Sequence, residues 1–291
     1  MKPKSILFYI LFFIVTSSGF VFLLFPGKEF AAYLSQVVKN QNLDLRIDNV
    51  KPAFPFTLGF GNTTLLLGRD MDKGMQIVPQ FFQVFLDPFS IFKKEKQIKF
   101  QSGFSPGSLK GHLLLNSLDP FLFSKVTASM SGVKIIDFRY KTDLADITLD
   151  CELNGEYIQA GAGDNKVLGK GSMLIQKFSA EMKDSLFIVL NLPVVDFSEI
   201  TLEFTQHPKR LTLNRCIARG PIINVKLKGE IDILFPVQKT RLNLSGVILP
   251  DSPYLAKFVN YSAIKSVAGN SKKDGIIFTI KGTLENPEMG I

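Results

Sequence analysis

Residues 221–235 read PIINVKLKGEIDILF, and this stretch decides the fold class. Its even positions from 224 to 232 are polar or charged, whereas the odd positions are apolar apart from Gly229. A strict period of two predicts a strand with one apolar face and one face in water. The candidate apolar groove or core face consists of Ile223, Val225, Leu227, Ile231 and Ile233.

The same alternation recurs along most of the chain, so we expect one all-β domain over residues 43–291. No series of alternating helices could build a parallel sheet. A sheet of this length must cover its apolar face, curl on itself or offer that face to a ligand. The sequence predicts a mainly β fold, an extended, curved antiparallel meander that is groove-like or sandwich-like, with a few short helices. The expected strands are 43–50, 57–67, 75–86, 96–103, 107–115, 122–130, 132–140, 144–153, 155–161, 170–178, 185–192, 199–205, 210–218, 221–233, 240–249 and 275–284.

Two helices are expected beside these strands. Residues 26–42 should form a juxtamembrane amphipathic helix, because Phe30, Leu34, Val37 and Val38 recur at three- and four-residue spacing. A second helix is expected over 251–267, which has a capping residue and a proline at its start.

A transmembrane anchor is expected near the start of the chain. The run from Ile6 to Phe25 is twenty residues without a charge, enough for a helix about 30 Å long that matches a bilayer core. Lys2 and Lys4 lie in residues 1–5, and positive flanks stay in the cytoplasm. We therefore expect a single-pass inner-membrane protein with most of the chain outside the cytoplasm. A cleaved signal peptide is the alternative, but its apolar core is usually shorter and ends at a small-residue cleavage site.

The modest basic excess suits ordinary solvation or a surface near anionic lipid headgroups, of which we favour solvation, and it does not suggest a nucleic acid as partner. The chain has 34 Lys and Arg against 26 Asp and Glu, without a basic block typical of nucleic-acid binding. The cluster of Lys93, Lys94 and Lys96 is interpreted either as a solvated turn or as a contact with anionic lipid headgroups.

The sequence offers little for catalysis or for metal binding. The two histidines, His112 and His207, have polar neighbours, and no zinc-ligand spacing exists. The glycine-rich stretch 161–171 has the wrong spacing for a phosphate-binding loop. We expect no catalytic residue, no metal and no cofactor, and hence a protein that is not an enzyme.

The two cysteines are expected to be free thiols. Cys151 falls in phase with Leu149 and Leu153, whereas Cys216 alternates with Asn214 and away from Leu213. A disulfide needs Cβ vectors that face each other, which this phase difference disfavours.

Short motifs resemble those of known envelope proteins. They are PGSLKG at 106–111, the segment from FSEI at 197–200 to GEID at 229–232, and the ending KGTLENP at 281–287. With the anchor, they make the chain similar to the longer form of the N protein of bacterial type II secretion systems. Residues 78–104, a strand, an Asp-Pro turn and a basic second strand, also resemble the AsmA-like group.

These resemblances imply two functions. The first is an inner-membrane, periplasm-facing accessory of type II secretion, which acts through contacts with the inner-membrane platform and the secretin. The alternative is an AsmA-like β-groove that handles phospholipid or tethers the envelope. Neither resemblance carries over a catalytic residue.

Overall fold

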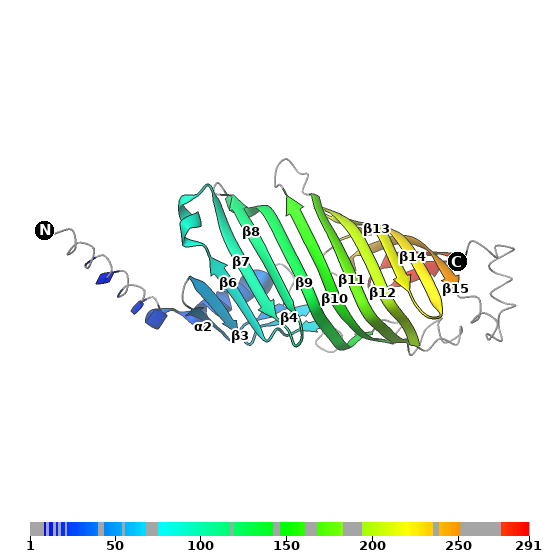
Figure 1. Ribbon diagram of the computed structural model, residues 1–291, viewed down its shortest axis with the longest axis horizontal. Helices are drawn as coiled ribbons and strands as arrows, with labels where there is room; N and C mark the ends of the chain where they lie inside the picture. The colour runs from blue at the N-terminus through cyan, green and yellow to red at the C-terminus, as the bar shows by residue number, and fades with distance from the viewer. Residues whose placement is uncertain are drawn as a thin grey trace.

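The fold is one long antiparallel sheet, seen in a computed structural model of the chain (Figure 1). The structure describes residues 9, 12–13, 16, 19–20, 22–39, 44–53, 56–67, 75–116, 119–141, 146–160, 168–182, 194–234, 239–250 and 275–290. Fourteen strands follow in the order β17-β16-β15-β14-β13-β12-β11-β10-β9-β8-β7-β6-β3-β2. The prediction of a mainly β fold built on a long, curved antiparallel meander is confirmed.

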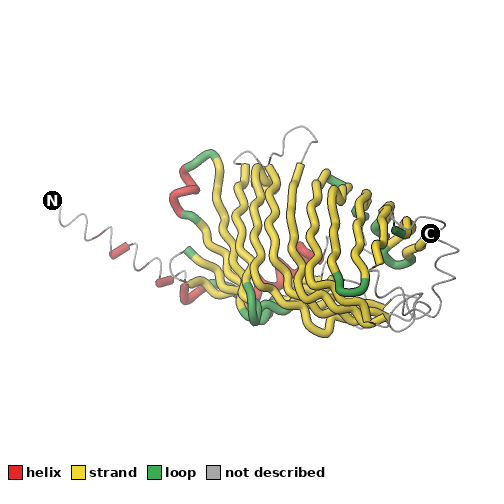
Figure 2. The backbone as a smooth tube through the Cα atoms, turned by 45° about the vertical axis from the view of Figure 1, so that its right-hand side comes forward, coloured by secondary structure: helices red, strands yellow, loops and turns green. Residues whose placement is uncertain are grey.

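The strands lengthen towards the middle of the sheet, which curves along its length (Figure 2). The longest, β9, has 23 residues. The bounds are β2 Asn49–Ala53, β3 Thr57–Gly61, β6 Phe81–Leu86, β7 Glu95–Gly103, β8 Ser108–Asn116, β9 Asp119–Lys141, β10 Asp146–Ala160, β11 Leu168–Met182, β12 Val194–His207, β13 Arg210–Arg219, β14 Ile223–Asp232, β15 Arg241–Pro250, β16 Ile276–Thr283 and β17 Pro287–Gly290.

A second, three-stranded sheet explains why three expected strands are each split in two. It consists of β1 Asp44–Arg46, β4 Thr64–Leu67 and β5 Met75–Ile77, so the chain passes between the sheets three times. Asp48 follows β1 and Asn62 follows β3, and the Asn62 amide donates a hydrogen bond to the Asp48 carboxylate at 2.8 Å. Asn62 has φ 44°, a left-handed conformation that asparagine tolerates. This pair ties two of the crossing points together.

Helix α2, Gly27–Lys39, closes the β2 end of the large sheet and corresponds to the expected amphipathic helix. It packs against β1 and β2, where Ala31 and Val50 are each only 1% exposed. A Cβ atom on Gly27 would lie 2.0 Å from the Val50 carbonyl oxygen, so only glycine lets the helix begin this close to β2.

Two expected breaks are wrong because they are bulges within continuous strands. The pairs 122–130 with 132–140 and 144–153 with 155–161 are the single strands β9 and β10. Gly132 takes φ 63°, and its N–H donates to the Asn154 side-chain oxygen at 2.8 Å. The glycine therefore marks a bulge between neighbouring strands rather than a turn.

The tetrapeptide Leu-Asp-Pro-Phe occurs twice in the sequence, at 86–89 and at 118–121, and the Asp-Pro pair has a different role in each copy. After β6, Asp87 caps the short 3-10 helix η1, Pro88–Phe92, by accepting a hydrogen bond from the Phe89 N–H at 3.0 Å. At the second copy, Asp119 and Pro120 begin strand β9, a position that proline tolerates. The expected strand 185–192 and the expected helix 251–267 lie outside the described residues, and β17 was not predicted.

Ile6 and half of the predicted anchor lie outside the described residues. The described residues from Tyr9 to Leu24 are helical, and the Thr16 hydroxyl donates to the Phe12 carbonyl. Phe25 is half-buried just before α2, with its ring 5.8 Å from that of Phe30. Within the part of the chain that the structure describes, none of the helices is long and apolar enough to qualify as a membrane-crossing helix.

Candidate functional site: the apolar face of the large sheet

One face of the large sheet carries mainly apolar side chains, and we call it the apolar face. Strand register shows this, because side chains of directly paired residues lie on the same face. In one row Leu58 pairs with Val84, Val84 with Phe100, Phe100 with Gly111 and Gly111 with Ala128. A second row continues through the C-terminal strands by way of Leu202, Cys216, Leu227, Gly246 and Phe278.

Four of the five residues expected to form an apolar face lie on it. Ile223, Val225, Leu227 and Ile231 of β14 pack against a buried cluster, while Lys226 and Lys228 between them are exposed. Ile233 lies just beyond β14, where its N–H donates to the Lys209 carbonyl at 2.8 Å. The buried cluster consists of Val195, Phe197, Ile200, Leu213, Cys216, Ala218 and Leu244.

Irregularities keep the apolar residues on one face where the sequence changes phase. On β13, Leu213 and Cys216 belong to the same buried cluster although three positions separate them, because the register shifts between them. The expectation that Cys216 points away from Leu213 is therefore wrong: Asn214 and Arg215 form a bulge. On β12 the alternation also shifts by one position, because the buried residues are Val195 and Phe197 and then Ile200.

Both cysteines are buried free thiols, as predicted, although the reason differs from the expected one. Cys151 on β10 and Cys216 on β13 are separated by three inter-strand spacings, or about 14 Å. That distance is about twice what a disulfide allows. Burial raises the pKa of both thiols, and the neighbouring Asp150 carboxylate adds to the rise at Cys151.

A polar group interrupts the apolar face near the centre of the sheet. The Tyr157 hydroxyl lies 2.7 Å from the Gln159 side-chain oxygen and 2.9 Å from that of Gln206. Its ring stacks on Phe204 with centroids 6.3 Å apart, and burial raises the pKa of the phenol. The two rings lie over glycines of β11, since a Cβ atom on Gly171 would meet the Phe204 ring at 2.2 Å.

The opposite, polar face carries exposed ion pairs. Arg210 contacts Asp232 at 2.8 Å and Glu230 at 3.0 Å, and this pairing raises the pKa of the guanidinium. Arg215 pairs with Glu203 and Arg219 with Glu199. Because these pairs are exposed and screened by water, each contributes little to stability.

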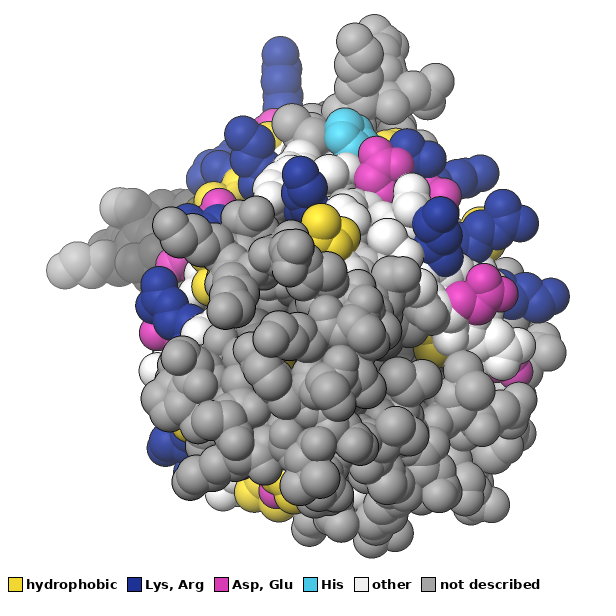
Figure 3. All heavy atoms as spheres, turned by 90° about the vertical axis from the view of Figure 1, so that its right-hand side faces the viewer, with side chains coloured by type: hydrophobic (Ala, Val, Ile, Leu, Met, Phe, Trp, Pro, Cys, Tyr) yellow, Lys and Arg dark blue, Asp and Glu magenta, His cyan; other side chains and the backbone are white. Residues whose placement is uncertain are grey.

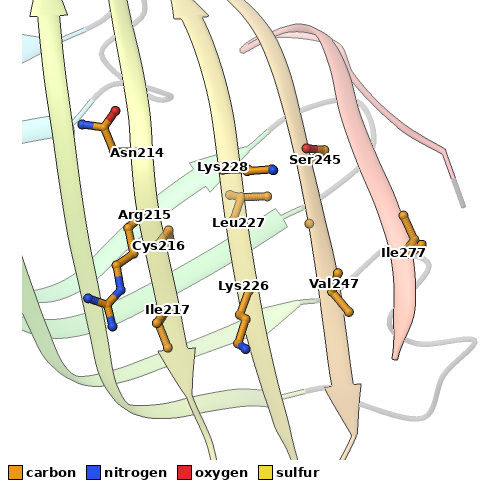
Figure 4. A pocket seen from close by; sticks show the side chains of 11 residues that line it. Asn214, Arg215, Cys216, Ile217, Lys226, Leu227, Lys228, Ser245, Val247 and Ile277 are labelled. Atoms are coloured by element: carbon orange, nitrogen blue, oxygen red, sulfur yellow. The ribbon is translucent and has the colours of Figure 1, made fainter. Parts of the chain in front are cut away.

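The polar face also holds a shallow depression of about 490 Å³ (Figure 4). A cross-strand row runs through it from Ile217 to Lys226, Val247 and Ile277. Ile277 is 67% exposed. The depression therefore combines apolar side chains with the exposed lysines 226 and 228.

The three lysines of the predicted headgroup contact lie together at one border of the sheet. Lys93 ends η1, Lys94 follows it, Lys96 is the second residue of β7, and all three are exposed. His112 and His207 are also exposed, and the His112 ring nitrogen lies 3.2 Å from the Gln97 amide nitrogen. Among the described residues, no three His, Cys, Asp or Glu side chains gather in a way that could hold a metal ion.

Comparison of the chain with protein-family models, with curated proteins and with solved structures gives no match.

Proposed function

We propose that this protein is a membrane-tethered β-groove that binds the acyl chains of lipids along its apolar face. The carrying observation is the contrast along that face. In β12, β13 and β15 it carries fully buried side chains that form one cluster, and half-buried side chains of β14 pack against them. From β6 to the part of β9 between Val126 and Met130, the corresponding large apolar side chains are all only half-buried. The half-buried set includes Phe82, Val84, Ile98, Phe100, Leu109, Leu113, Val126 and Met130.

Partly exposed apolar side chains in a continuous row favour a ligand of matching chemistry. Removing apolar surface from water stabilises by about 25 cal/mol per Å². Large exposed apolar patches are uncommon on soluble monomers and usually mark a binding or membrane site. An acyl chain is apolar and extended, so it could follow a row such as Ile98, Leu113 and Val126 across paired strands.

The membrane tether belongs to the same proposal. The run from Ile6 to Phe25 would cross the inner membrane once, with Lys2 and Lys4 in the cytoplasm and the sheet in the periplasm. Helix α2 would then place the β2 end of the sheet next to the bilayer, where lipid could reach the half-buried part of the apolar face.

A second candidate function is an accessory role in type II secretion, with the inner-membrane platform and the secretin as partners. The observation that favours it is the depression on the polar face. Ile277 and Val247 form an apolar pair there, with Ile217 on the far side of Lys226, and such a mixture of apolar and charged groups suits protein contact. The motifs that resemble those of the secretion N protein favour the same candidate.

Lipid analysis of the purified protein separates the two candidates. Full-length protein is purified in a mild detergent, and bound phospholipid is quantified by mass spectrometry. Cells are crosslinked in parallel. We expect about stoichiometric phospholipid, which should fall in Leu113→Gln on the apolar face and stay unchanged in its neighbour His112→Gln on the polar face. Absence of lipid, together with crosslinks to secretion proteins, would contradict lipid binding and support the second candidate.

A further inference from the structure

A line of exposed cations follows one border of the large sheet, and we call it the basic rim. Its members come from separate turns and strand ends, yet the strand pairing places them along the same border. They are Lys93, Lys94, Lys96, Lys125, Lys209 and Arg241.

The register connects this border from β7 to β16. Lys96 pairs with Leu115 near the end of β8, and the adjacent Leu114 pairs with Lys125 near the start of β9. Lys125 pairs with Ala160 at the end of β10. Further along, Arg210 follows Lys209 and pairs with Asp232, which pairs with Arg241 at the start of β15.

Acidic groups near the basic rim leave it with an excess of positive charge. Asp232 and Glu230 are both held by Arg210, at 2.8 and 3.0 Å, and Glu95 is exposed between Lys94 and Lys96. The six cations of the basic rim make no ion pair with other described residues. Figure 3 shows Lys and Arg side chains gathered along the upper part of the C-terminal end of the molecule.

The opposite border differs in its charges. There Arg219 pairs with Glu199 at 3.3 Å, and nearby Lys177 pairs with Glu152 at 3.7 Å. Asp150 and Asp196 are exposed along the same side. Arg219 and Lys177 are therefore each paired with a carboxylate on this side, unlike the cations of the basic rim.

We propose that the basic rim binds the anionic headgroups of phospholipids whose acyl chains lie on the apolar face. This inference rests on the proposed lipid-binding function and adds the class of lipid and its orientation. Lys96 shares the strand phase of Ile98 and Phe100, so it stands at the point where the apolar face meets the basic rim. Lysine side chains keep apolar stems along such a surface while their ammonium groups reach water or a phosphate.

Lipid competition tests this orientation. Full-length protein in a neutral detergent is given an equimolar mixture of phosphatidylglycerol and phosphatidylethanolamine, and bound lipid is quantified after gel filtration. We expect about tenfold enrichment of the anionic lipid, since juxtamembrane lysines favour anionic headgroups. The triple variant Lys93→Gln/Lys94→Gln/Lys96→Gln should lose most of that enrichment while it keeps its total bound lipid. The enrichment should also decrease at high salt, because exposed charges are screened.

The matched control removes three exposed lysines of the polar face, Lys110→Gln/Lys226→Gln/Lys228→Gln, and should keep the wild-type enrichment. Equal binding of both lipids by the wild type, or equal loss in both triple variants, would overturn the inference and leave lipid binding intact. If the wild type binds neither lipid, the proposed function fails and the inference fails with it. Unchanged thermal melting of both variants verifies that folding is unaffected.

Discussion

The two halves of the apolar face have the same sequence pattern and different burial. In β12 and β13, Ile200 and Leu213 are each 8% exposed, within one cluster. In β7 and β8, Ile98 and Leu113 also lie on the apolar face, directly paired with each other, and remain half-buried. Alternation therefore determines which face a side chain joins, but not whether another part of the molecule covers it. The half-buried part is where a ligand would gain most by covering apolar surface.

The largest effect should come from a charge placed in the buried cluster. Leu213→Asp buries a carboxylate without a partner, and we expect a loss of about 4 kcal/mol or more in the free energy of unfolding. Leu113→Asp should cost less than half as much, because its carboxylate can reach water. Denaturant unfolding of the two variants measures the difference. Equal losses of unfolding free energy in the two variants would mean that Leu113 and Leu213 are equally buried from water.

Truncation of two isoleucines tests the same contrast without a charge. Ile200→Ala should cost about 3 kcal/mol, whereas Ile98→Ala should cost about 1 kcal/mol because less apolar surface leaves the protein interior. The measurement is the midpoint of urea unfolding for each variant, compared at an unchanged dependence of the unfolding free energy on urea concentration. A larger loss of unfolding free energy in Ile98→Ala than in Ile200→Ala would contradict the placing of Ile98 in the half-buried part and Ile200 in the buried part.

A pair of glycines distinguishes the two ends of the sheet at the level of the backbone. Gly229 on β14 has φ 147°, and a Cβ atom there would lie 2.3 Å from the Asn243 carbonyl oxygen. We expect Gly229→Ala to cost about 2 kcal/mol. In Gly59→Ala on β3 the nearest atom would be 3.8 Å away, so the change should be within about 0.5 kcal/mol. Thermal melting of both variants would show whether the backbone at position 229 needs glycine.

The buried thiols should give a smaller, pH-dependent effect. Burial raises the folded-state pKa of Cys216 above its ordinary value of 9.0, so the neutral thiol is the form that the fold favours. This contribution is fully present below pH 9.0 and is lost as the pH rises through the higher folded-state pKa. Wild type should therefore lose more stability than Cys216→Ala between pH 8 and pH 10.5. Identical slopes for the two proteins would show that the thiol stays neutral equally well in the unfolded chain.

The sequence predicts the strands and their faces better than their junctions. Alternation in 221–233 places Leu227 and Lys226 on opposite faces, because side-chain direction depends only on local phase. The bulge that returns Cys216 to the apolar face was missed, since it depends on pairing with β14. The chain passes between the two sheets near Asp48 and Asn62, where these two side chains contact each other. Alternation in the sequence does not reveal a contact between residues that are distant along the chain.

The candidate site was predictable only in part for the same reason. Lys93, Lys94 and Lys96 stand together in the sequence, so their cluster was recognised. Lys125, Lys209 and Arg241 join them only through the register of eight intervening or neighbouring strands, β8 to β15. The apolar face itself was expected, but its division into a buried and a half-buried part depends on tertiary packing.

Photo-crosslinking with a phospholipid that carries a diazirine in its acyl chain tests the central claim most directly. The full-length protein is irradiated in detergent with this lipid, and adducts are mapped by mass spectrometry. We predict adducts on the half-buried apolar side chains of β6 to β9, such as Phe82, Ile98 and Leu113, with few on their polar-face neighbours Gln83 and His112. Adducts distributed equally over both faces, or confined to residues 6–25, would contradict an acyl-chain site on the apolar face.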